Sequence, residues 1–243
     1  MVLQAITTRM PIFRVTGFGN LQQTLGRKDM TSPFAYTIHT PASMKPGITY
    51  PVVFALHGIG YTEKDMISVI EELNEKLIVI GVRGQRPYEN GYAYYYLKGY
   101  GNPEREQFDE SVGMLDRFID YAANRYPIDR ERMYLLGFSQ GAILSLTLAL
   151  RLGKKNKGRP CHERLHPILR ERRVPDSIDG SSVRIPVGRP GRSYLPPHIG
   201  EESYQYLKER VGSIRYQTYA AAHEISDANR EDAVAWIRME VTR

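Results

Sequence analysis

The sequence predicts an α/β fold, with a mostly parallel central sheet and helices on both of its faces. Residues 51–56 and 77–82 form two apolar runs, and the segment between them has helical features. A third run, 134–138, leads into a serine and then into the apolar segment 142–150. Strands that are apolar on both faces are typical of buried parallel sheets, and two such strands around a helix form a right-handed βαβ unit.

The length of 243 residues is sufficient for one sizeable domain. We expect that domain to span residues 31–243, with a disruption across 151–195, where the structure should be irregular or disordered. Residues 1–30 are poorly patterned and predict a poorly ordered N-terminal extension, so Met30 is a candidate for the true start. N-terminal sequencing of the native protein would decide that point.

The composition predicts a soluble protein without internal disulfides. It is 42% hydrophobic and 25% charged, and no apolar run is long enough to span a bilayer. The first 30 residues hold no secretory apolar region. The single cysteine, Cys161, fits a reducing compartment, so we expect a cytoplasmic protein. No group of cysteines and histidines has the spacing of metal ligands.

The net charge of +6 has a local origin. Residues 151–193 hold twelve Lys and Arg against four Asp and Glu, so the rest of the chain is slightly acidic. This basic segment has no Phe, Tyr or Trp to stack on bases and no helical face. We therefore expect no nucleic-acid partner, and salt-dependent DNA retention that is lost on deleting 151–193 would show otherwise.

The first half of the chain contains the elements of a doubly wound sheet. Residues 34–39 predict a strand before the run at 51–56. Thr62 is a suitable N-cap with Asp65 in the capping-box position, which predicts a helix to about residue 75. An amphipathic helix follows, and its apolar residues recur at helical spacing: Phe108, Val112, Leu115, Ile119 and Ala122.

The pattern breaks after residue 150 and returns after Pro197. In 151–193 no apolar run reaches strand length, although a doubly wound sheet needs at least one more buried strand there. Residues 201–210 have helical character, 213–219 predict a strand, and 226–240 predict a terminal helix with Trp236 on its apolar face.

A tyrosine-rich stretch, residues 88–96 together with Tyr100, follows a predicted strand end. Ligands in open α/β sheets bind at the carboxyl ends of the strands, so these rings could form a wall of a substrate pocket. Aromatic residues that cover the core would give the same pattern, and the sequence does not separate the two interpretations.

The residues Gly137-Phe138-Ser139-Gln140-Gly141 join an apolar strand to an apolar helix. Gly-x-Ser-x-Gly in that context predicts a sharp turn that exposes a nucleophilic serine at the N-terminus of a helix. Serine needs a neighbouring base, usually a histidine that a carboxylate orients. Four histidines follow Ser139, namely His162, His166, His198 and His223.

His223 is the candidate base because it lies in a small-residue loop between the last predicted strand and the last helix. The first two histidines lie in the disrupted segment, and His198 follows two prolines in a loop. Attack on a carbonyl forms an oxyanion that needs two backbone N–H donors. We expect these from Gln140, which follows the nucleophile, and from Ile59, which follows the strand at 51–56.

These motifs resemble the phospholipase/carboxylesterase family of the α/β-hydrolase fold. The similar residues are Leu56-His57-Gly58, the sharp turn with its serine from Gly137 to Ala142, and His223-Glu224-Ile225. The resemblance covers about residues 34–150 and 197–237, and it implies a small cytosolic serine esterase. It also implies Ser139 as nucleophile, His223 as base, and Ile59 and Gln140 as the oxyanion hole. One departure is Ala222, where the family usually has glycine before the histidine.

Residues 151–195 depart further from the family. The family has two strands there and a Gly-x-x-Asp-Pro loop, which supplies the acid of the Ser-His-Asp triad, the carboxylate that orients the histidine. Neither is present, which suggests a reading-frame shift. Reading the codons of residues 158–167 one base later permits an apolar strand that ends in Ser-Gly. The same shift over 188–196 permits Gly-Gly-Arg-Ala-Asp-Pro. The alternative is a genuine basic insertion with lost strands.

The expected chemistry is hydrolysis of carboxylic esters or thioesters of small-molecule substrates through an acyl-enzyme on Ser139, with no metal or organic cofactor. An impaired or non-catalytic hydrolase-fold protein is the alternative, because the triad Asp and two strands are missing. A serine peptidase of the same fold is a further alternative. The substrate and the oligomeric state are not readable from the residues.

Overall fold

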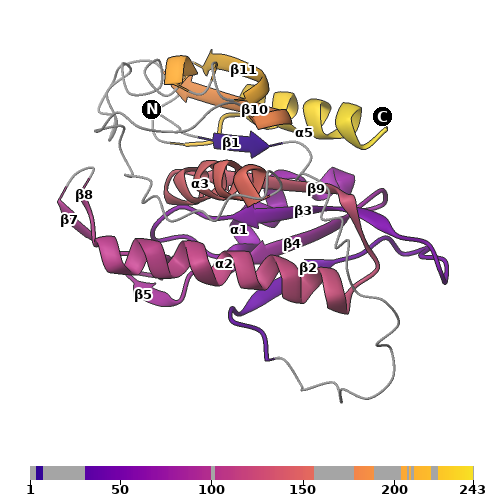
Figure 1. Cartoon of the computed structure of the whole chain (residues 1–243), viewed down its shortest axis with the longest axis horizontal. Helices are drawn as coiled ribbons and strands as arrows, with labels where there is room; N and C mark the ends of the chain where they lie inside the picture. The colour runs from indigo at the N-terminus through magenta and orange to yellow at the C-terminus, as the bar shows by residue number, and fades with distance from the viewer. Residues whose placement is uncertain are drawn as a thin grey trace.

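A computed structural model describes residues 4–7, 31–99, 102–155, 178–188, 204–206, 208, 211–219 and 224–242. Its centre is a seven-stranded sheet in the order β11-β10-β1-β9-β3-β4-β2. These strands are β1 (Gln4–Thr7), β2 (Tyr36–His39), β3 (Tyr50–Leu56), β4 (Ile78–Val82), β9 (Ile128–Phe138), β10 (Ile178–Gly188) and β11 (Val211–Tyr219). In Figure 1 they follow one another from β2 at the bottom to β11 at the top.

Helices and two small hairpins connect the strands. The helices are α1 (Glu63–Val69), the short 3-10 helix η1 (Glu71–Leu73), α2 (Arg105–Arg125), α3 (Gln140–Lys155) and α5 (Asp227–Val241). Strands β5 (Arg86–Tyr88) and β6 (Gly91–Ala93) form one hairpin, and β7 (Leu97–Gly99) and β8 (Asn102–Pro103) form the other. The elements predicted between residues 34 and 150 are thus present, except that the helix predicted to about residue 75 ends at Val69 and is followed by η1.

The central sheet is mostly parallel, as predicted. Strands β3, β4 and β9 run parallel to one another, and β10 runs parallel to β11. Both β9 and β10 are antiparallel to β1, so these five strands share one direction, while β1 and β2 run the other way. The carboxyl ends of β3, β4 and β9 therefore meet at one edge of the sheet, which is where the candidate site lies.

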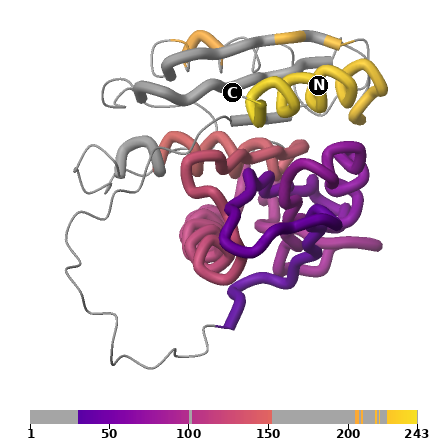
Figure 2. Tube along the Cα trace, turned by 90° about the vertical axis from the view of Figure 1, so that its right-hand side faces the viewer, coloured from indigo at the N-terminus to yellow at the C-terminus, as the bar shows by residue number. Residues whose placement is uncertain are grey.

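Each face of the sheet has its own apolar core. Along β3, Val52, Phe54 and Leu56 pack with α2 and α3, whereas Val53 and Ala55 pack with α1 and α5. This alternation is the period of two that a strand imposes on its side chains. Figure 2 shows the layers from the side, with α2 seen end-on on one side of the sheet and α5 on the other.

Two helix caps agree with the sequence. The Thr62 backbone N–H donates to the Asp65 carboxylate at 2.7 Å, which completes the predicted capping box at the start of α1. At the other end of the chain, Ser226 caps α5 by accepting the Asn229 N–H at 3.3 Å. Trp236 lies buried on the inner face of that helix, as its sequence pattern predicts.

Two strands lie where the sequence predicts none. Residues 4–7, in the expected poorly ordered extension, form β1 between β9 and β10. Residues 178–188, in the segment expected to be irregular or disordered, form β10, so the prediction is wrong for this part of 151–195. Val183, Ile185 and Val187 alternate with polar residues or proline, which is the pattern of a strand. The prediction missed this strand because the pattern is short and Pro186 interrupts it.

Within the described residues, no helix has the length and apolar character required to cross a membrane.

Candidate active site

The turn after β9 holds Ser139 in a strained conformation. Its φ angle is +51°, in the left-handed region that residues with a side chain rarely adopt. A Cβ atom at Gly137 would lie 2.3 Å from the Gly141 carbonyl oxygen, and one at Gly141 would lie 2.1 Å from the Leu56 carbonyl oxygen. Both positions therefore require glycine, and the close approach of β9, α3 and β3 depends on them. The predicted sharp turn is present.

The loop after β3 lies directly beside this serine. A Cβ atom at Gly58 would be 3.3 Å from the Ser139 Cβ atom and 2.8 Å from the Phe138 ring. Gly58 thus brings the backbone of the loop against the nucleophile turn, which a side chain at this position would prevent. Ile59, the next residue, is partly exposed at this edge of the sheet.

His57 fixes the orientation of this loop. Its buried ring accepts the Gly84 N–H at Nε2, at 2.8 Å, and its Nδ1 lies 2.6 Å from the Gly58 carbonyl oxygen. Nε2 is an acceptor, so the proton of the neutral ring resides on Nδ1 and is donated to Gly58. Burial lowers the pKa of His57, which favours this neutral form.

The backbone around the two predicted oxyanion donors leaves their N–H groups available. The Gly58 carbonyl accepts from His57 and from the Tyr61 N–H, so in a trans peptide the Ile59 N–H points the opposite way. Gln140 is the first residue of α3, where a backbone N–H has no partner within the helix. Neither N–H has an acceptor among the residues that the structure describes.

The Gln140 side chain joins the nucleophile turn to the tyrosine-rich stretch. Its Oε1 accepts the Tyr94 N–H, and its Nε2 donates to the Tyr95 carbonyl oxygen, both at 2.7 Å. Tyr94 and Tyr95 are almost completely buried and belong to the core. Tyr88 and Tyr61 are exposed beside the loop after β3. The core interpretation is therefore confirmed for Tyr94 and Tyr95, whereas a pocket wall formed by the exposed rings stays a prediction.

The hairpin β5–β6 supports the loop from its outer side. The Gly60 N–H donates to the Tyr92 carbonyl at 2.9 Å, and the Tyr92 N–H donates to the Tyr61 carbonyl at 3.0 Å. The Arg83 guanidinium lies 4.9 Å from the centre of the Tyr92 ring and makes two hydrogen bonds, of 2.7 and 2.8 Å, to buried Glu63. These bonds lower the pKa of the Glu63 carboxyl, so it stays ionised.

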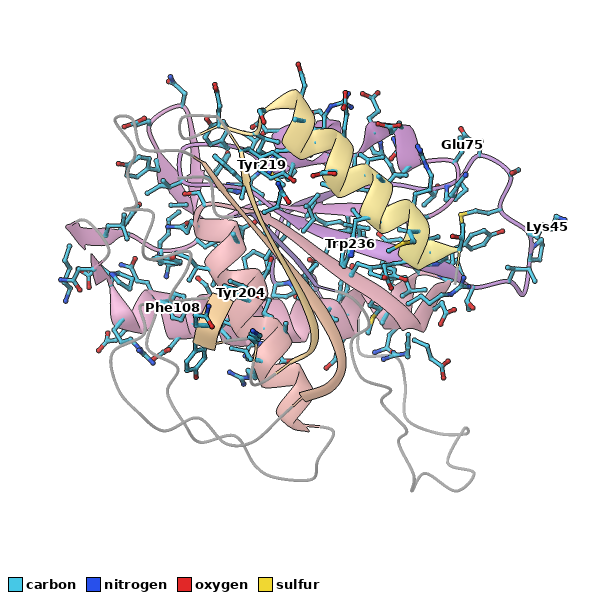
Figure 3. The ribbon with its side chains drawn as sticks, turned by 90° about the horizontal axis from the view of Figure 1, so that it is seen from above. Lys45, Glu75, Phe108, Tyr204, Tyr219 and Trp236 are labelled. Carbon is cyan, nitrogen blue, oxygen red and sulfur yellow. The ribbon has the colours of Figure 1, made fainter. Side chains whose placement is uncertain are left out.

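The candidate base, His223, lies outside the described residues. In the chain it follows β11 and precedes the N-cap of α5. Figure 3 shows Tyr219, the last residue of β11, near the start of α5, and Lys45 at the far end of the molecule. Of the predicted site residues, the structure places Ser139, Ile59 and Gln140 at one edge of the sheet.

Sequence reasoning missed the side-chain roles of His57, Gln140, Glu63 and Arg83. For His57 a signal existed, because a histidine at the end of a fully apolar run is buried and needs partners. The partners themselves, such as Gly84 27 residues away, had no local signal.

The sheet and the strained serine turn define an α/β hydrolase. The model of the phospholipase/carboxylesterase family matches residues 47–240, so the chain belongs to that family. MhqD of Bacillus subtilis strain 168 is 28% identical over 196 residues, which are 79% of this chain and 94% of that protein. Acyl-protein thioesterase 1 of Debaryomyces hansenii is 25% identical over 154 residues, 59% of this chain and 65% of its own.

A solved structure shows the same fold. The carboxylesterase from Mesorhizobium loti superposes with a TM-score of 0.68 at 20% identity, covering 85% of this chain and 95% of its own. The family match supports ester or thioester hydrolysis as the activity, and it does not favour the alternative of an impaired or non-catalytic protein.

Proposed function

We propose that the chain is a serine esterase that hydrolyses carboxylic esters or thioesters through an acyl-enzyme on Ser139. The observation that carries this proposal is the turn at Ser139, with its φ angle of +51° and its two glycines that admit no side chain. Such strain persists only where the surrounding structure imposes it, and a turn that exposes a serine at a helix N-terminus suits nucleophilic attack.

The reaction has two steps. Ser139 attacks the carbonyl carbon while His223 accepts the serine proton, and the Ile59 and Gln140 N–H groups bind the oxygen that becomes negative. His223 then gives the proton to the leaving alcohol or thiol, and the acyl group stays on Ser139. Water repeats the sequence and releases the acid. The chain needs no cofactor for these steps. We also propose that the enzyme is cytoplasmic, because a single cysteine cannot form an internal disulfide and fits a reducing compartment.

The test is hydrolysis of p-nitrophenyl acetate together with labelling by a fluorophosphonate probe. We expect the wild-type chain to hydrolyse the ester and to carry the probe on Ser139, while Ser139→Ala does neither. His223→Ala should keep its fold and lower the activity, by less than in a complete triad because this chain lacks the acid that orients the base. Wild-type activity that persists in Ser139→Ala would refute the proposal.

We also propose that residues 151–195 result from a reading-frame shift in the coding sequence. One feature of the fold supports this. In a doubly wound sheet the strand after α3 should lie parallel beside β9, but β1 lies there, antiparallel, and β10 is one place further out. The missing strand and the missing triad acid would both come from the shifted frame.

The nucleotide sequence across codons 148–200 tests the frame shift directly. We expect the shifted frame to be open and to encode Gly-x-x-Asp-Pro near the codons of residues 188–196. A stop codon in that frame, or the absence of that motif, would show that the basic segment is a genuine insertion.

A further inference from the structure

The tyrosines around the site differ in whether their ring faces are occupied. The Tyr94 ring stacks on His57 with 4.8 Å between centres, and the Arg83 guanidinium covers the Tyr92 ring at 4.9 Å. The buried Tyr95 ring packs edge-on against Phe108 at 5.1 Å. Tyr94 and Tyr95 are therefore structural and have no face to offer a ligand, and Arg83 occupies one face of the half-buried Tyr92 ring.

Tyr61 and Tyr88 are different, because 45% and 36% of their surfaces are exposed. Tyr61 packs edge-on, at 5.7 Å, against Phe138, the residue before the nucleophile. The Tyr88 ring lies 3.8 Å from the position of a Cβ atom at Gly60. Both rings thus flank the loop that carries the Ile59 N–H, and that loop packs directly against Ser139 at Gly58.

The backbone behind these two rings is fixed. Tyr61 is held to Tyr92 by the hydrogen bonds between the loop and the hairpin β5–β6. Tyr88 ends β5, and the Tyr96 ring, tilted at 6.4 Å from it, donates its hydroxyl proton to the Pro87 carbonyl at 2.9 Å. A substrate group that contacts these rings therefore meets a surface whose backbone is already ordered, which lowers the entropy cost of binding.

We infer that Tyr61 and Tyr88 determine specificity and that, given the ester hydrolysis proposed above, the preferred substrates carry an aromatic ring. Two exposed tyrosine rings offer aromatic contact to a planar group, which loses few internal rotations on binding. A flexible alkyl chain loses more rotamer freedom when it binds to the same two rings. The ring therefore gains more than a chain of similar size.

Two matched pairs of esters test the preference. Phenethyl acetate and hexyl acetate differ in the end of the alcohol, whereas ethyl hydrocinnamate and ethyl hexanoate differ in the end of the acyl group. Within each pair the atoms next to the reacting carbonyl are the same. The ratio of kcat/KM within a pair, measured on one preparation, is independent of how much of the protein is folded.

We expect the wild-type enzyme to prefer the aromatic ester in at least one pair, which identifies the side of the ester that meets the tyrosines. Tyr61→Leu and Tyr88→Leu should each lower that ratio by about two- to tenfold. Tyr61→Phe and Tyr88→Phe, which keep the ring, should preserve it. The matched control is Tyr50→Leu, at the other end of β3, which should also leave the ratio unchanged.

Equal kcat/KM values within both pairs, or a ratio that survives both leucine variants, would overturn this specificity. A wild-type enzyme that hydrolyses none of the four esters and takes no fluorophosphonate on Ser139 would instead overturn the proposed function itself. The two failures are therefore distinguishable.

Discussion

The two turns that form the candidate site are held in different ways. The nucleophile turn, Gly137 to Gly141, depends on steric fit, because two glycines allow three backbone segments to touch. The loop from His57 to Tyr61 depends on hydrogen bonds to distant residues, among them Gly84 and Tyr92. One turn is encoded by five consecutive residues, and the other by contacts with residues far along the chain.

This difference predicts different responses to substitution. A steric fit between backbone atoms cannot relax by a side-chain movement, so an added methyl group should disrupt the whole turn. A hydrogen-bonded loop can lose one bond and keep its course, so its variants should lose catalytic rate before they lose the fold.

The largest effect should come from Gly141→Ala. The new Cβ atom would lie 2.1 Å from the Leu56 carbonyl oxygen and 2.7 Å from that of His57, so β3 and α3 must separate. We expect a loss of about 3 kcal/mol or more in the free energy of unfolding, measured by urea denaturation, and no labelling of Ser139.

Gly113→Ala is the matched control for that variant. Gly113 lies inside α2, and a Cβ atom there would meet only the Arg117 side chain, at 3.8 Å. Alanine should stabilise the protein by about 0.5–1 kcal/mol, because glycine is a poor residue in a helix interior. Equal destabilisation by both alanines would contradict the steric account of the nucleophile turn.

The sequence was sufficient to predict the nucleophile turn and the elements on either side of it. Its five residues carry the whole signal, and the neighbouring apolar runs specify strand and helix. The loop could be predicted only as far as the position of Ile59, since its bonds reach Gly84 and Tyr92 across an intervening helix and strand. Strand β1 was missed because four residues without clear alternation give no periodicity to detect.

A medium effect should come from His57, whose two ring nitrogens can be replaced one at a time. His57→Asn keeps a donor near Nδ1 for the Gly58 carbonyl, whereas His57→Gln keeps only an acceptor near Nε2 for Gly84. We expect kcat for p-nitrophenyl acetate to fall by about tenfold in the first variant and by about 10²-fold in the second, the lower range for loss of an oxyanion donor.

The pH dependence of unfolding distinguishes this role from simple packing. Burial lowers the pKa of His57 in the folded protein, so on acidification the unfolded chain takes up the proton first, near pH 6.5. The wild-type protein should therefore lose stability as the pH falls below about 6.5, relative to His57→Asn. A constant difference between the two from about pH 7.5 to about pH 5 would argue against a buried neutral ring.

The smallest effect should come from Glu63→Gln, which removes the charge of the pair behind the Tyr92 ring. We expect about 1 kcal/mol of destabilisation at pH 7, since the neutral amide has nearly the same shape as the carboxylate and its oxygen still accepts a hydrogen bond from Arg83. The pKa of the Glu63 carboxyl is lowered in the folded protein. Its contribution to the free energy of unfolding is therefore complete above the pKa of the unfolded chain, near 4.3, and disappears as the pH falls through the lower pKa of the folded protein.

The control is Glu72→Gln, whose exposed pair with Arg238 should contribute less than about 0.5 kcal/mol. Urea denaturation between about pH 7 and about pH 3 measures both, and a wild-type advantage over Glu63→Gln that grows on acidification would contradict the assignment.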